Sequence, residues 1–124
     1  MNAQEVFGIQ LPLIQAPMAG VQASALTIAV SQAGGLGSLP CAMLTHDALR
    51  TELAVIATSG IKAYQINFFA HTPPVPDAAR EAAWRESLAP YYREFGIDAA
   101  SIPTGPGRMP FSPEALEIIA PFKP

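Results

Sequence analysis

Three short apolar runs, separated by two helical patterns, constrain the fold of this chain more than any other feature. The runs are residues 11–15, 36–39 and 63–69, and proline closes the first two. The alternation of strand and helix predicts an α/β fold with a parallel sheet and right-handed crossovers. Because parallel strands share one direction, the carboxyl ends of all three runs should lie at the same edge of the sheet.

The segments between the runs carry the start and stop signals of helices. Ser24 is expected to cap the first helix and Gly34-Gly35 to end it, while Thr45 should cap the second helix and Ser59-Gly60 end it. The residues expected on the inner stripes are Leu26, Ala29, Val30 and Ala33 in the first helix and Leu49, Leu53, Ile56 and Ala57 in the second.

The composition changes after residue 72, where ten of the thirteen prolines follow. Asp77 should cap a helix that Pro90 either kinks or divides into two short helices and that Gly96 ends. Its apolar stripe would hold Trp84, Leu88, Tyr91, Tyr92 and Phe95. A loop over residues 97–111 and a last helix over residues 114–122, opened by Ser112 and Pro113, complete the prediction. We therefore expect three βα units in residues 1–72 and a Pro-rich helical insert with a last helix in residues 73–124 of the same domain.

Charge and composition exclude several classes of partner. Lys and Arg number only seven, the net charge is −3, and no basic stripe is present to bind nucleic acid. Residues 24–44 are rather apolar but are interrupted by Gly, Ser and Pro, which argues against a membrane span. The single cysteine, Cys41, fits a reducing compartment, and residues 1–5 lack the positive start of a secretory signal. We expect a cytoplasmic protein.

Candidate site residues follow the carboxyl ends of the predicted strands, in residues 16–22, 40–45 and 67–72. Asn67 carries two donors and an acceptor and could hold the polar edge of a flat ligand, or it could tie a loop to the backbone. Met18 could lie against a ring system, although methionine more often fills a core. The glycines at 34, 35 and 37 follow a helix and open a strand, which is the reverse of a phosphate-binding loop.

Other reactive residue types give no catalytic assignment. Cys41 has no basic neighbour in the sequence to stabilise a thiolate. His71 could move a proton, but its place before Pro73 favours a role in orienting the loop, and His46 should be solvated. Arg108, in a Gly-Pro-Gly-Arg turn, could cover an anionic ligand. Two histidines and one cysteine far apart form no metal-ligand pattern, so we expect no metal.

Three motifs of this sequence match those of a known family. They are Gln15-Ala16-Pro17-Met18-Ala19-Gly20, then residues 31–38 (SQAGGLGS), then Asn67-Phe68-Phe69 followed by His71-Thr72-Pro73-Pro74. Together they resemble the amino-terminal part of the nitronate monooxygenases, also called 2-nitropropane dioxygenases, over nearly the whole chain. The first two motifs are shared with the FMN-dependent enoyl-acyl-carrier-protein reductases. The run from Asn67 to Pro74, with its helical insert, favours the nitronate branch.

The resemblance implies a (β/α)₈ barrel that binds FMN and oxidises alkyl nitronates with O₂ to carbonyl compounds and nitrite. In the family, the Ala-Pro-Met turn lines the isoalloxazine and the Asn after the third strand meets its polar edge. These roles map onto Ala16, Pro17, Met18 and Asn67 as FMN-binding residues.

The family's catalytic histidine and its FMN-phosphate glycines belong to stretches that this sequence does not contain, so no catalytic role is carried over. With three of eight barrel strands, the chain is expected to be a fragment. One alternative is a fragment of an enoyl reductase. Another is a non-catalytic stub that self-associates through exposed sheet edges, because the three strands are expected to be apolar on both faces.

Overall fold

The structure, a computed structural model, describes residues 2–102 and 110–124. These residues form two compact units. The first unit contains residues 2–71 and 110–124, and the second contains residues 72–102.

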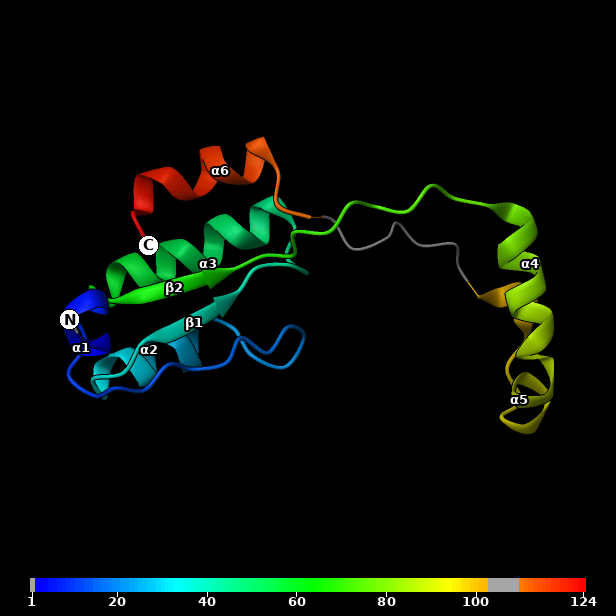
Figure 1. Ribbon diagram of the computed structural model, residues 1–124, viewed down its shortest axis with the longest axis horizontal. Coiled ribbons are helices and arrows are strands. Elements are labelled where there is room, and N and C mark those ends of the chain that lie inside the picture. The colour runs from blue at the N-terminus through cyan, green and yellow to red at the C-terminus, as the bar shows by residue number, and fades with distance from the viewer. Residues whose placement is uncertain (1, 103–109) are drawn as a thin grey trace. The chain divides into compact units, whose positions relative to one another are not determined.

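A parallel sheet organises the first unit (Figure 1). Strand β1 (Gly37–Pro40) pairs with β2 (Tyr64–Asn67), with Gly37 opposite Tyr64 and Pro40 opposite Asn67. The connection between them is α3 (His46–Thr58), so β1, α3 and β2 form a parallel βαβ unit. The predicted α/β class with a parallel sheet is confirmed.

The first predicted strand, residues 11–15, is reduced to a single parallel bridge between Ile14 and Leu36. The amide of Gln15 donates to the Leu36 carbonyl at 2.9 Å, and the amide of Leu36 donates to the Leu13 carbonyl at 2.9 Å. Pro12 has no amide to donate, and the amide of Leu13 turns back to the Leu11 carbonyl. Regular pairing is therefore confined to one position, and the prediction of a five-residue strand was wrong.

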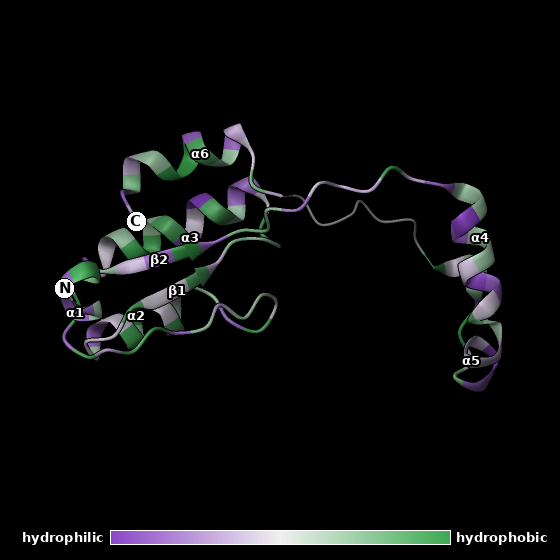
Figure 2. Ribbon diagram, viewed as in Figure 1, coloured by the Kyte–Doolittle hydropathy of each residue, from purple (hydrophilic) through white to green (hydrophobic). Residues whose placement is uncertain are grey.

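Helix α3 was predicted closely, and it forms the centre of the core. The Thr45 hydroxyl accepts a hydrogen bond from the amide of Ala48, and the helix ends before Ser59, as expected. Of the predicted inner stripe, Ala57 alone is exposed. The core cluster contains Leu39, Cys41, Leu49, Leu53, Ile56, Ile118 and Ile119. Figure 2 shows hydrophobic segments on both α3 and α6 (Pro113–Ile119), which pack against each other.

Helix α2 (Ser24–Gln32) differs from its prediction in two respects. Its N-cap is Ala23, and Ser24 lies inside the helix, where its amide donates to the Glu52 carboxylate at 2.8 Å. The buried positions are Ser24 and Thr27, whereas Leu26 is 39% exposed. The backbone of Gly37 lies in close contact with Thr27. The small-residue face of α2 therefore packs on the sheet, and the predicted apolar stripe points outward.

Smaller elements complete the first unit. Helix α1 (Ala3–Phe7) starts with a capping box between Asn2 and Glu5. Helix α6 is capped by Ser112 with Pro113 in its first turn, as predicted, but it ends at Ile119 and continues as the 3₁₀ turn η2 (Ala120–Phe122). The strands expected at 36–39 and 63–69 begin or end a few residues from their predicted bounds.

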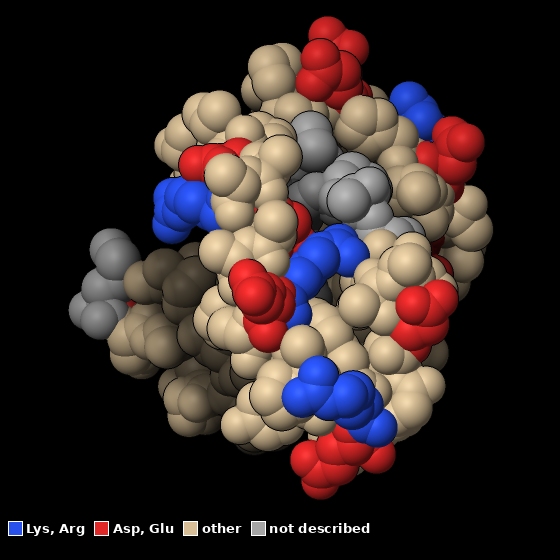
Figure 3. Space-filling model, turned by 90° about the vertical axis from the view of Figure 1, so that its right-hand side faces the viewer, with Lys and Arg blue, Asp and Glu red and all other residues tan. Residues whose placement is uncertain are grey.

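The second unit contains α4 (Ala78–Ser87), α5 (Ala89–Glu94) and the 3₁₀ turn η1 (Ala99–Ser101). Asp77 caps α4, and the chain divides into two helices at Leu88, two residues before Pro90, as predicted. The predicted stripe is not buried within the unit, since the exposed fractions of Trp84 and Phe95 are 62% and 68%. On the face shown in Figure 3, acidic and basic side chains are interspersed. The turn predicted around Arg108 begins within residues 103–109, which lie outside the described residues.

Candidate functional site

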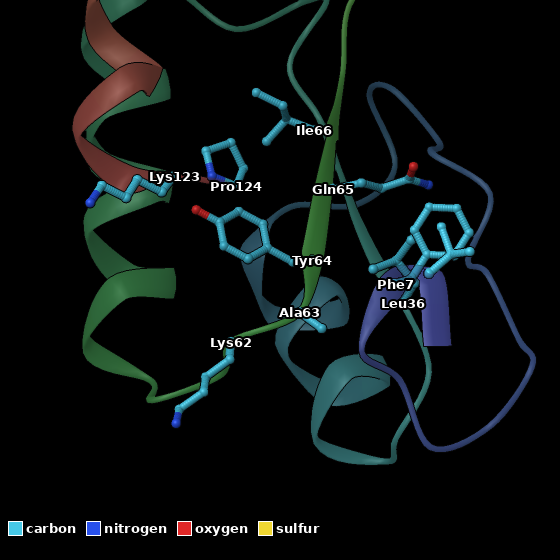
Figure 4. A pocket seen from close by; sticks show the side chains of 10 residues that line it. Phe7, Leu36, Lys62, Ala63, Tyr64, Gln65, Ile66, Lys123 and Pro124 are labelled. Atoms are coloured by element: carbon cyan, nitrogen blue, oxygen red, sulfur yellow. The ribbon is translucent and has the colours of Figure 1, made fainter. Parts of the chain in front are cut away.

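The two faces of the sheet have different chemical character. Gly37 and Leu39 of β1 face the helices: a Cβ on Gly37 would lie 2.1 Å from the Thr27 carbonyl oxygen, and Leu39 is fully buried in the core cluster. Their register partners Tyr64 and Ile66 also pack against the core. Figure 4 shows the side chains of Tyr64 and Ile66 on one side of β2 and that of Gln65 on the other.

The opposite face carries the alternate residues of each strand, because successive side chains in a strand point to opposite sides. These are Ser38 and Pro40 on β1 and Gln65 and Asn67 on β2. Gln15 belongs to the same face, since its side chain and carbonyl both contact Ser38. The expectation that the strands are apolar on both faces was therefore wrong: one face is apolar and the other is largely polar.

Asn67 lies at the carboxyl end of β2, directly opposite Pro40. Its backbone carbonyl accepts a hydrogen bond of 2.9 Å from the amide of Cys41. Its half-buried side-chain amide makes no hydrogen bond to any other described residue. The alternative use of this side chain, to tie a loop to the backbone, is not realised within the described chain.

The turn that contains Ala16, Pro17 and Met18 follows the Ile14 bridge. Because this bridge is parallel, the turn leaves the sheet at the same edge as Pro40 and Asn67. The Met18 carbonyl accepts a hydrogen bond from the amide of Val21 at 3.3 Å, and Gly20 adopts φ = 84°, which favours glycine. Ala16 is exposed, Pro17 is half-buried and Met18 is 42% exposed, so Met18 is not a core residue here.

The reactive residue types near this edge do not form a catalytic group. Burial raises the pKa of Cys41 to about 12, against a lowering by the hydrogen bond with the Asn67 backbone, so the thiol is protonated at neutral pH. His71 is exposed, and its ring lies 6.0 Å from that of Phe69. His46 is also exposed. The described residues contain no group of three potential metal ligands.

A hydrogen-bonded cluster of four polar side chains was missed by the sequence reasoning. It contains Gln15, Gln22, Ser38 and Gln65. Three of these precede a predicted site residue or a proline by two positions, as in Gln15-x-Pro17, Ser38-x-Pro40 and Gln65-x-Asn67. That period of two was a usable signal for a shared face, whereas nothing in the sequence marked Gln22.

A cavity of about 500 Å³ lies along β2 (Figure 4). It is lined by Tyr64 and Ile66, by Phe7 and by Lys62 and Lys123, among others. Because Asn67, Pro17 and Met18 do not line it, this cavity is not the candidate site. In the described part of the chain, no helix is both long enough and apolar enough to cross a membrane.

Comparison with known proteins decides the family. The family model described as nitronate monooxygenase matches residues 2–101. The chain belongs to the nitronate monooxygenase family. This membership confirms the resemblance drawn from the three motifs and makes the protein, by family, an oxidoreductase.

Named relatives agree with nitronate monooxygenase membership. The nitronate monooxygenase of Pseudomonas aeruginosa is 42% identical over 93 residues, which are 75% of this chain and 26% of the relative. That of Paraburkholderia phytofirmans is 43% identical over 91 residues, or 73% of this chain and 25% of the relative. The chain thus spans about a quarter of the length of the curated relatives it matches.

The solved nitroalkane oxidase of Streptomyces ansochromogenes superposes with a TM-score of 0.58 at 30% identity, covering 73% of this chain and 25% of that one. FabK of Thermotoga maritima superposes with a TM-score of 0.53 at 23% identity, covering 77% of this chain and 27% of that one, and it supports the fold alone.

Proposed function

We propose that this chain supplies the isoalloxazine-facing part of an FMN-dependent (β/α)₈ barrel that oxidises alkyl nitronates with O₂ to carbonyl compounds and nitrite. The observation that carries the proposal is the Asn67 amide, which has no hydrogen-bond partner among the described residues and lies at the same sheet edge as Pro17 and Met18. Family membership supports the choice of nitronate as the substrate class.

The residues at this edge fit the ring of a flavin. The rim of an isoalloxazine presents hydrogen-bond acceptors and a donor, and the Asn67 amide offers two donors and an acceptor to match them. The exposed thioether of Met18 can pack on an aromatic ring, and Pro17 adds a rigid apolar contact. When bound, FMN would supply the redox chemistry, taking electrons from the nitronate and passing them to O₂.

The chain's own residues then orient the ring, hold one side of it and exclude water from that side. Asn67 orients the ring by its polar edge, and Met18 and Pro17 hold one side of it and exclude water from that side. The Ala16 backbone leads into this turn directly from Gln15, which is buried. No proton transfer is assigned to His46 or His71, because neither histidine contacts the Asn67 side chain in the described part of the chain.

The proposal is tested by NMR titration of the 124-residue chain with FMN and with riboflavin. The family's phosphate-binding glycines have no counterpart in this sequence, so binding should be weak, and both ligands should shift the same resonances to similar extents. The Met18 methyl and the Asn67 side-chain amide should move most. Shifts confined to the second unit, or a strong preference for FMN over riboflavin, would contradict the assignment.

Matched variants sharpen the titration. Asn67→Ala should reduce the affinity for riboflavin about fivefold or more, because one hydrogen-bonded amide contributes about 1 kcal/mol. Gln32→Ala is the control, since Gln32 is exposed on α2 and makes no hydrogen bond through its side chain within the described chain. Equal losses in both variants would show that Asn67 does not contact the ring.

Catalysis should require more of the enzyme than this chain contains. We expect the purified chain, mixed with FMN and an alkyl nitronate, to show no nitrite formation above the rate without protein. Turnover on the order of 10 per second, typical of complete enzymes, would show that the catalytic groups lie within these 124 residues.

A further inference from the structure

The edge of β1 that faces the Ile14 segment loses its strand partner at Ser38. Up to Leu36 the two segments exchange backbone hydrogen bonds, and beyond Gln15 the chain turns away through Ala16 and Pro17. Ser38 is fully buried, so its amide and carbonyl cannot be satisfied by bulk water. A buried backbone group without a partner costs about 1–3 kcal/mol.

Two glutamine side chains take the place of the missing strand. The amide of Ser38 donates to Gln15 Oε1 at 3.1 Å, and Gln22 Nε2 donates to the Ser38 carbonyl at 2.8 Å. Gln15 Nε2 also donates to Gln22 Oε1, which joins the two side chains. The Ser38 carbonyl also accepts a longer hydrogen bond, of 3.4 Å, from Gln15 Nε2. The pair therefore satisfies both the amide and the carbonyl of Ser38, as the peptide groups of a neighbouring strand would.

The same serine ties β2 into the cluster. Its hydroxyl donates to the Gln15 carbonyl and accepts a hydrogen bond of 2.5 Å from Gln65 Nε2. Gln15 immediately precedes the Ala16-Pro17-Met18 turn, and Gln65 lies two residues before Asn67 on the same face. Both parts of the proposed flavin site are thus held through one buried residue of β1.

The turn itself is largely exposed. Gln15 and Gln22 bracket residues 16–21, among which Val21 is 79% exposed and Met18 is 42% exposed. A single hydrogen bond of 3.3 Å, from Val21 to Met18, closes the turn internally. The position of the turn relative to the sheet therefore depends on the two amides at its ends.

We infer that Gln15 and Gln22 are positioning residues for the flavin-facing turn, acting as a surrogate strand that fixes Pro17 and Met18 relative to Asn67. The inference rests on the proposed function for the identity of the ligand. The cluster itself is independent of any ligand. Loss of the Gln22 amide should release the turn while β1, β2 and α3 stay folded, because Gln22 lies outside the core cluster.

The test compares Gln22→Met, Gln22→Glu and the control Gln32→Met in the 124-residue chain by NMR. Gln22→Met keeps the length of the side chain but removes its donor and acceptor. Relaxation of the Gly20 and Val21 amides should then report a mobile turn, and the affinity for riboflavin should fall about five- to tenfold, since binding must pay to order the turn again. Gln32→Met should change neither measurement.

Gln22→Glu adds a reversible switch that a purely structural role would not show. The introduced carboxylate can accept from Gln15 but cannot donate to the Ser38 carbonyl, whereas the protonated carboxyl can do both. The turn should therefore be mobile at neutral pH and become ordered as the pH falls through the pKa of the introduced group. The wild-type chain over the same range is the control for the Glu52 carboxylate, which accepts a hydrogen bond from the Ser24 amide two residues beyond Gln22.

The outcomes separate the two proposals. An ordered turn in Gln22→Met, or a Gln22→Glu turn that ignores pH, would overturn the positioning role, whatever riboflavin does. A wild-type chain that shows no riboflavin shifts at Met18 or Asn67 would overturn the flavin assignment, while turn mobility in the variants would still support the surrogate strand. If Gln22→Met fails to fold, the pH series of Gln22→Glu decides the matter within one sample.

Discussion

Gly37→Ala should remove a large part of the stability of the first unit, because the sheet and α2 meet at Gly37 without room for a side chain. A Cβ at this position would lie 2.1 Å from the Thr27 carbonyl oxygen and 2.6 Å from the Ser31 hydroxyl. Ordinary contacts begin at 3.4 Å, so the shortfall against the helix backbone is 1.3 Å, and this carbonyl cannot rotate away as a side chain could.

The magnitude follows from two costs. Forcing atoms into a packed interior costs about 1–3 kcal/mol. The Ser31 hydroxyl also accepts from the Gly37 amide at 3.2 Å and donates to the Ala63 carbonyl at 2.8 Å, so its displacement breaks a bridge between β1 and the start of β2. At about 1 kcal/mol for each lost hydrogen bond, the total is about 3–5 kcal/mol, a large part of the stability of a small domain.

Urea denaturation followed by far-UV circular dichroism, at several protein concentrations, measures this loss. Gly60→Ala is the control, because Gly60 has open space around it and its φ of 77° costs an alanine about 1–2 kcal/mol. The double variant Gly37→Ala with Ser31→Ala should remain destabilised, since the contact with the Thr27 backbone persists. A Gly37→Ala protein within 1 kcal/mol of wild type would refute the close approach of β1 to α2.

Three further predictions address the core, a helix end and the sheet edge. Burial raises the pKa of the Cys41 thiol from an ordinary 9.0 to about 12. The contribution of Cys41 to stability should therefore be constant below pH 9 and fall by at most about 1.4 kcal/mol per pH unit between 9 and 12, and Cys41→Ala should lose this component of the alkaline decline in urea titrations. Thr45→Ala should cost about 1 kcal/mol through loss of the cap on α3, measured by the same denaturation, and an unchanged midpoint would contradict the capping role. The free chain should form a dimer or larger assembly, measured by light scattering, because apolar residues such as Leu13 and Ile14 are about half exposed beside the sheet. A stable monomer with cooperative unfolding would show that the chain itself covers these residues.

The positions of the candidate site residues could be predicted from the sequence, whereas the residues that hold them in place could not. The βα alternation and the prolines at 17 and 40 placed the Ala16-Pro17-Met18 turn and Asn67 at one edge, and the register of Pro40 with Asn67 agrees with that placement. The sequence could not show that the Asn67 amide has no partner among the described residues, since a strand-end asparagine has several local partners available to it. The role of Gln22 could not be predicted for a related reason. Its partner Ser38 is 16 residues away, and no local pattern encodes that contact.

The sequence by itself determined the local events of folding. Thr45, Asp77 and Ser112 cap helices, Pro90 divides one, and Gly34 and Gly60 adopt the positive φ that follows a helix, because each effect depends on groups within a few residues. Tertiary structure decided which faces are buried. The close contact at Gly37 turned Thr27 rather than Leu26 toward the sheet, and the departure of the chain after Gln15 replaced a strand with two glutamine side chains. Both outcomes arise between segments far apart in the chain, where packing space and unmet backbone groups outweigh local preference.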